Sequence, residues 1–102
     1  MVQVSAISAD GSASGAKAQN ADFLASDISY TDTREVTVTV SMLADALEVT
    51  FNGTDFFKLG TPSANTVTQY KFNVRNGDTV NFRTPDAGGT TLDIFRVDSR
   101  LV

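Results

Sequence analysis

The segment spanning residues 36–41 constrains the fold more than any other part of the chain, because it alternates strictly between valine and a hydroxyl residue. A side-chain period of two is typical of a β-strand with one apolar and one polar face. Similar short segments follow, separated by turn signals such as Asn52-Gly53 and Pro85-Asp86, and no stretch keeps helical periodicity. The pattern predicts an all-β protein, an antiparallel β-sandwich of about six to eight strands, with a jelly roll as one candidate topology.

The same alternation predicts which side chains form the core of this sandwich. In the last strand, residues 91–97, the apolar side chains change parity between Ile94 and Phe95, so we expect a β-bulge there or a strand buried on both faces. The expected core comprises Val36, Val38, Val40, Leu47, Val49, Phe51, Leu59, Tyr70, Phe72, Val80, Phe82, Leu92 and Ile94.

The segment around Gly77 predicts a β-hairpin, because turn length and side-chain parity can be checked against each other there. A two-residue loop would place polar groups among the aromatic side chains, whereas a three-residue loop with Gly77 in the left-handed conformation keeps the apolar face continuous. That loop pairs Phe72 with Val80 and Tyr70 with Phe82. The opposite, polar face would then carry Gln69, Lys71 and Asn73 across from Thr79, Asn81 and Arg83.

Composition removes several classes of function. The chain has no cysteine and no histidine, which excludes disulfides, thiolate nucleophiles, imidazole metal ligands and catalytic triads built on histidine, and no cofactor is expected. A net charge of -4 disfavours nucleic acid as a partner. No apolar run reaches the roughly 20 residues of a membrane helix, and the first residues lack the pattern of a signal peptide. We therefore expect synthesis in the cytoplasm and no membrane contact.

The chain divides near residue 34 into two regions, 1–34 and 35–102. The first is rich in Ala, Ser and Gly, with apolar patches at Val2/Val4 and at Phe23, Leu24 and Ile28. One interpretation makes these patches edge strands of the same domain. The other makes region 1–34 an extended arm that reaches a neighbouring subunit, with Phe23 and Leu24 among its contact residues. Residues 35–102 form the β-sandwich domain in both interpretations.

The carboxylates offer the main route to an enzyme, because a glycosidase needs only two acids at a fixed separation. Asp45, Asp55, Asp78 and Asp86 lie at predicted turns, where aspartate is favoured for hydrogen bonds to its own backbone, so the structural interpretation is preferred and no catalytic residue is assigned. Turn aspartates could also hold calcium, but Asp10-Gly11-Ser12 and Asp86-Ala87-Gly88 lack the dense spacing of a dedicated loop. Near the C-terminus, Arg96 and Arg100 beside Asp93 and Asp98 predict cross-strand ion pairs or a subunit contact.

The predicted polar face is the main candidate for recognition. Amides and cations on a rigid sheet can form directed hydrogen bonds to a sugar or to a protein surface, although antiparallel sheets commonly keep one polar face in water. A carbohydrate site usually adds an exposed aromatic platform, and only Tyr30, Phe56 or Phe57 could supply one here.

Four segments together resemble a known group of proteins. They are Ala-Leu-Glu-Val-Thr-Phe-Asn-Gly at 46–53, Val-Arg-Asn-Gly-Asp at 74–78, Phe-Arg-Thr at 82–84 and Leu-Asp-Ile-Phe-Arg-Val at 92–97. In this style of strand and turn the chain resembles small β-sandwich proteins of bacteriophage virions, namely capsid decoration (cement) and head-fibre proteins. The resemblance implies a non-enzymatic virion protein that binds the major capsid protein on the outside of the shell as a homotrimer or homodimer.

On that interpretation, residues 9–25 and part of one sheet face would contact the capsid, and deleting the arm would weaken attachment without unfolding the sandwich. The alternative function is a carbohydrate-binding module that uses the predicted polar face. It would bind its sugar through Gln69, Lys71, Asn73, Asn81 and Arg83.

Overall fold

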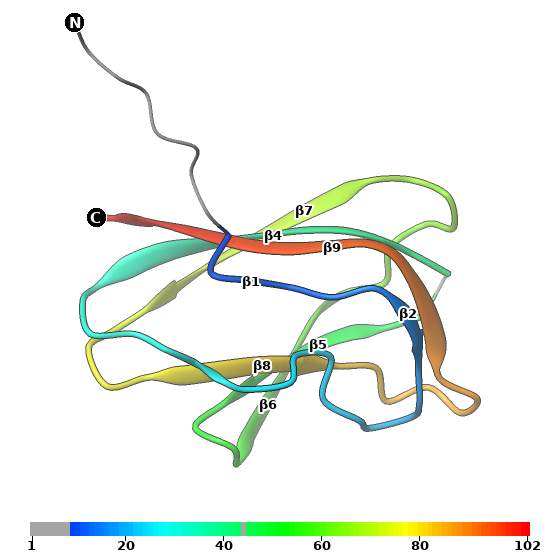
Figure 1. The fold of residues 1–102 in the computed structure, drawn as a ribbon, viewed down its shortest axis with the longest axis horizontal. Coiled ribbons are helices and arrows are strands. Elements are labelled where there is room, and N and C mark those ends of the chain that lie inside the picture. The colour runs from blue at the N-terminus through cyan, green and yellow to red at the C-terminus, as the bar shows by residue number, and fades with distance from the viewer. Residues whose placement is uncertain (1–8, 44) are drawn as a thin grey trace, which may run out of the picture.

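A computed structural model of the protein describes residues 9–43 and 45–102. Two antiparallel sheets lie face to face (Figure 1), sheet A with the order β1-β9-β4-β7 and β2 also paired to β9, and sheet B with the order β3-β8-β5-β6. The strands are β1 (Gly11–Ser12), β2 (Gly15–Lys17), β3 (Ile28–Ser29), β4 (Arg34–Met42), β5 (Leu47–Phe51), β6 (Asp55–Gly60), β7 (Thr68–Val74), β8 (Thr79–Arg83) and β9 (Thr90–Leu101).

The strand order is that of a jelly roll, so the predicted all-β sandwich is confirmed in its jelly-roll form. β1 and β2 pair with different parts of β9 and act as one interrupted strand, which leaves four positions in each sheet. From β2 to β9 the chain changes sheets at every connection except the β5–β6 hairpin. In that hairpin Asn52 and Gly53 both have positive φ, as a type I′ turn requires.

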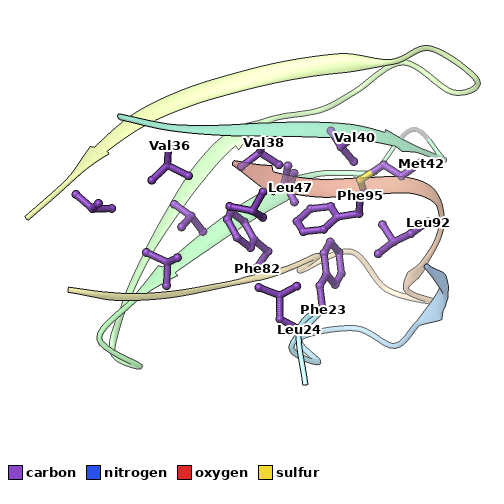
Figure 2. Packing of buried hydrophobic residues seen from close by; sticks show 14 of the residues in the cluster. Phe23, Leu24, Val36, Val38, Val40, Met42, Leu47, Phe82, Leu92 and Phe95 are labelled. Atoms are coloured by element: carbon purple, nitrogen blue, oxygen red, sulfur yellow. The ribbon is translucent and has the colours of Figure 1, made fainter. Parts of the chain in front are cut away.

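β4 shows why the valine alternation dominates the fold. It is paired on both sides, to β7 and to β9, and it turns Val36, Val38 and Val40 into the space between the sheets, where all three are fully buried (Figure 2). Each valine removes its side chain from water at a gain of about 2 kcal/mol.

The predicted irregularity in β9 is a β-bulge. Ser41 pairs with Ile94 and Met42 with Leu92, so that Asp93 is the extra residue. The bulge turns Ile94 to the outer face, where it is 43% exposed, and puts Phe95 in the core. The prediction that Ile94 belongs to the core is therefore wrong. The parity of the inward-facing side chains changes at Asp93, before Ile94, and not between Ile94 and Phe95.

The rest of the core agrees with the prediction in part. Leu47, Val49, Val80, Phe82 and Leu92 are buried as expected. The remaining predicted members are only partly buried and pack against the cluster from one side; they are Phe51, Leu59, Tyr70 and Phe72. The buried members that the prediction did not include are Phe23, Leu24, Tyr30, Met42, Val74, Phe95 and Val97.

The predicted β7–β8 hairpin is wrong. β7 pairs with β4 in sheet A, whereas β8 pairs with β3 and β5 in sheet B. The turn itself has the expected left-handed Gly77, with φ of 95°. The aromatic side chains still meet, because Phe72 and Phe82 approach across the core with ring centroids 6.2 Å apart.

The described part of region 1–34 forms edge strands of the sandwich. β1 and β2 extend sheet A, and the chain then crosses to sheet B, where Phe23 N donates to Phe82 O and β3 pairs with β8. Phe23 is 2% exposed and Leu24 6%, so neither can contact another molecule without opening the core. Deleting residues 9–25 would remove both from the core, so the structure argues against the expectation that the sandwich survives this deletion. Val2 and Val4 lie outside the described residues.

Candidate functional site

The six residues of the predicted polar face lie on opposite surfaces of the molecule. Because β7 and β8 belong to different sheets, Gln69, Lys71 and Asn73 lie on the outer face of sheet A. The other three, Thr79, Asn81 and Arg83, lie on the outer face of sheet B. The structure therefore replaces one predicted face by two separate ones.

The outer face of sheet A collects a larger set of polar side chains than the sequence predicted. The register of β1, β9, β4 and β7 aligns these side chains in rows that run across the strands. We call them the sheet A face: Ser12, Arg96, Thr39 and Gln69 in one row, Asp98, Thr37 and Lys71 in the next, and Arg100, Glu35 and Asn73 in the third. Sequence parity identifies the residues of β4 and β7 as outward-facing, but only the strand order makes these ten residues neighbours.

Charges on the sheet A face are mostly paired. Arg100 Nε lies 3.0 Å from Glu35 Oε1 and joins β9 to β4, which confirms a cross-strand ion pair, while Arg96 Nε lies 3.0 Å from both oxygens of Asp98 on the same strand. Gln69 Nε2 donates to Thr39 Oγ1 at 3.1 Å. Exposed pairs of this kind stabilise a fold by at most about 1 kcal/mol, so a partner can exchange them for its own contacts at low cost.

On the sheet B side, Asn81 is a structural residue and not a surface contact. It is 2% exposed, its Oδ1 accepts from Leu24 N at 3.0 Å, and its Nδ2 donates to Leu24 O at 3.1 Å and to Asp27 Oδ1 at 2.8 Å. These bonds fasten the crossing segment to β8. The assignment of Asn81 as an exposed binding residue is therefore wrong.

Arg83, its neighbour on the same face, has two partners. Its Nε lies 2.9 Å from Glu48 Oε1, and its guanidinium carbon lies 3.6 Å from the centroid of the Phe56 ring. The ion pair joins β8 to β5, and the ring contact reaches across β5 to β6; both limit the availability of Arg83 for a ligand.

The aromatic residues do not complete a carbohydrate site on the sheet A face. Tyr30 is 5% exposed and donates to Asp10 Oδ2 at 3.0 Å; burial and the nearby Asp10 charge raise its pKa above the usual value. Phe56 lies under Arg83, and Phe57 lies on β6 at the edge of sheet B. No described position that points outward from β4, β7 or β9 is aromatic.

Two of the turn aspartates accept backbone hydrogen bonds, Asp78 within its own turn as predicted and Asp86 from a distant segment. Asp78 Oδ2 accepts from Arg75 N at 2.8 Å, and Asp86 Oδ2 accepts from Ala46 N at 2.6 Å. Among residues 9–43 and 45–102, no three acidic, histidine or cysteine side chains come together in a way that could hold a metal ion. The described residues also contain no helix that could span a membrane.

The fold places the chain in the class of jelly-roll β-sandwiches. In comparisons with known proteins, no family model, no curated protein and no solved structure matched.

Proposed function

We propose that the protein is a non-enzymatic structural component of a virion that attaches to the outer surface of the capsid through the sheet A face. The observation that carries the proposal is the breadth of this face, on which ten polar side chains from four strands lie in register. A rigid array of this kind suits another folded protein surface, because it offers many weak contacts in a fixed geometry.

The chemistry of the sheet A face supports a protein partner. It presents amides, hydroxyls and charges of both signs, and such mixed charge sets orientation and register when two proteins meet. The jelly roll also occurs in viral capsid and lectin domains, which agrees with the proposal, although fold alone does not assign function.

The proposal moves the contact surface away from the N-terminal region. Residues 9–34 pack on their own sandwich, so apart from Ser12, which belongs to the sheet A face, their contribution to attachment would be to hold β9 in place. The contact residues are instead Lys71, Gln69 and Asn73 of the original prediction, together with their neighbours on β4 and β9.

Co-sedimentation with capsid shells of the source virus, assembled from its major capsid protein, tests the proposal. Lys71→Glu reverses one charge in the middle row of the sheet A face, on the edge strand β7, and is expected to weaken retention by about fivefold or more. Arg75→Glu is the matched control, because it makes the same charge reversal at an exposed position in the β7–β8 turn and should change retention less than about twofold. No retention of the unmodified protein, or an equal loss in both variants, would contradict the proposal.

A further inference from the structure

The edge of sheet B formed by β6 has no partner strand among the described residues. β6 pairs only with β5, so the backbone N–H and C=O groups along its other side face away from the sheet. Two adjacent phenylalanines on this strand are exposed, Phe56 by 44% and Phe57 by 55%. An unpaired strand with exposed aromatic side chains is a template for pairing with another chain.

This edge continues directly into the core. The Phe57 ring lies 5.7 Å from Phe51, and Phe51 lies 5.6 Å from Phe72, in edge-to-face contacts that join β6 to β5 and to β7 of the other sheet. A shallow pocket between the two sheet edges is lined by Phe51, Phe57 and Asn73, among others. A molecule that covers β6 would therefore also cover the half-buried aromatic side chains behind it.

Two outer-face side chains of β6 are complementary to a reversed copy of the strand. On the outer face Phe56 and Lys58 are two residues apart, so an antiparallel copy centred on Phe57 would set each of them opposite the other. On this face Lys58 lies opposite Glu48 of β5, and the Phe56 ring lies against the Arg83 guanidinium. Each cation therefore has an acid or an aromatic ring beside it. A register centred on Lys58 would instead place two ammonium groups together.

We propose that a second copy of this chain pairs with the β6 edge, antiparallel, with Phe57 facing Phe57 of the partner subunit. In this dimer the two copies of sheet B form one continuous sheet about a two-fold axis, and an isologous contact of this kind is closed. Phe56 contacts Lys58 of the partner subunit on the outer face, twice by symmetry. The dimer is measured on the isolated protein, so its test is independent of capsid attachment.

Sedimentation equilibrium of the full chain tests the dimer up to about 500 μM, a range that detects a Kd as weak as about 1 mM. The unmodified protein is expected to dimerise. Phe57→Lys and Phe57→Asp each place like charges at the symmetry axis and should raise the Kd by about tenfold or more. Mixed in equal amounts, the two variants should form a heterodimer, because the lysine introduced in one variant then faces the aspartate introduced in the other; this result also shows that both are folded.

Val67→Lys is the matched control, since Val67 is also 55% exposed but lies outside β6. It should leave the dimer Kd within about twofold. A monomeric unmodified protein, an unchanged Kd in the Phe57 variants, failure of the mixture to dimerise, or an equal loss in Val67→Lys would each overturn the proposal.

Discussion

The two sides of the sandwich along which strand edges lie differ, because a chain segment covers one of them and not the other. On one side the segment after β2 crosses from sheet A to sheet B and runs beside β8, donating from Asn20 N to Thr84 O and from Phe23 N to Phe82 O. Phe23 then packs edge-to-face on Phe95, with centroids 5.4 Å apart. On the other side, between β6 and β7, nothing in the described chain covers the strand edges, and Phe57 remains exposed.

The difference between the closed and open sides does not follow from hydrophobicity. The closing segment is rich in small residues and contributes only Phe23, Leu24 and Ile28 as large apolar side chains, whereas the open side holds more aromatic surface. What closes the first side is backbone hydrogen bonding along a strand, reinforced by Asn81. A sandwich edge is thus closed by a segment that runs along it, while a connection that crosses at one end leaves it open.

The largest expected contrast is between aromatic truncations on the two sides. Phe23→Ala should lower the free energy of unfolding by about 3–5 kcal/mol, because it leaves a cavity under the closing segment. Phe57→Ala should cost less than about 1 kcal/mol, since more than half of its side chain is already in water. Urea unfolding at low protein concentration measures both. Equal losses would show that the β6 edge is as much a part of the core as Phe23.

Glycine-to-alanine substitutions make the identical change on each side of the sandwich. A Cβ at Gly89 would overlap the backbone carbonyl of Lys17, and its φ of +72° disfavours any side chain, so Gly89→Ala should cost roughly 2–4 kcal/mol. At Gly60 the Cβ would come 2.6 Å from Tyr70 Oη, but this half-buried side chain can swing outward. Gly60→Ala should cost about 1 kcal/mol. Thermal unfolding ranks the two, and a reversed order would mean that Tyr70 is held firmly.

Asn81→Ala tests whether hydrogen bonds close the first side. The substitution leaves both Leu24 N and Leu24 O without their partner in a buried place, at a cost of about 2–3 kcal/mol. Asn73→Ala, on the exposed sheet A face, is the matched control and should cost less than about 0.5 kcal/mol. Hydrogen exchange at Leu24 provides a local measurement. Protection that survives in Asn81→Ala would contradict the role given to this amide.

The sequence allowed local conformation to be predicted better than strand pairing. A period of two reveals which way each side chain of β4 points, and a parity change reveals the bulge in β9, because both are properties of one strand. Neither reveals which strand lies alongside. The turn at Gly77 has the predicted left-handed glycine, yet it joins two sheets, and this single difference divides the predicted polar face in two. For Phe23 and Leu24 the sequence leaves edge strands and an extended arm both open, because these residues stand among small residues with no periodicity around them.

The two tyrosines supply the smallest contrast, in the dependence of stability on pH. Tyr30 lies on the closed side, where burial first and the Asp10 charge second raise its pKa; Tyr70 lies on the open side, where burial alone raises its pKa. Above the ordinary tyrosine value of 10.0 the unfolded chain loses its phenolic protons while folded Tyr30 keeps its own. The free energy of unfolding should therefore fall as pH rises from about 10, by at most about 1.4 kcal/mol per pH unit for one group.

Tyr30→Phe should remove most of this decline, and at neutral pH it should cost about 1 kcal/mol through the lost hydrogen bond to Asp10. Tyr70→Phe should leave most of the decline in place, because Tyr70 is only partly buried and has no neighbouring carboxylate among the causes of its shift. Urea midpoints between pH 8 and about pH 11.5 measure all three proteins. An unchanged slope in Tyr30→Phe would mean that water reaches the Tyr30 hydroxyl, and the first side would then be less tightly closed than its backbone hydrogen bonds indicate.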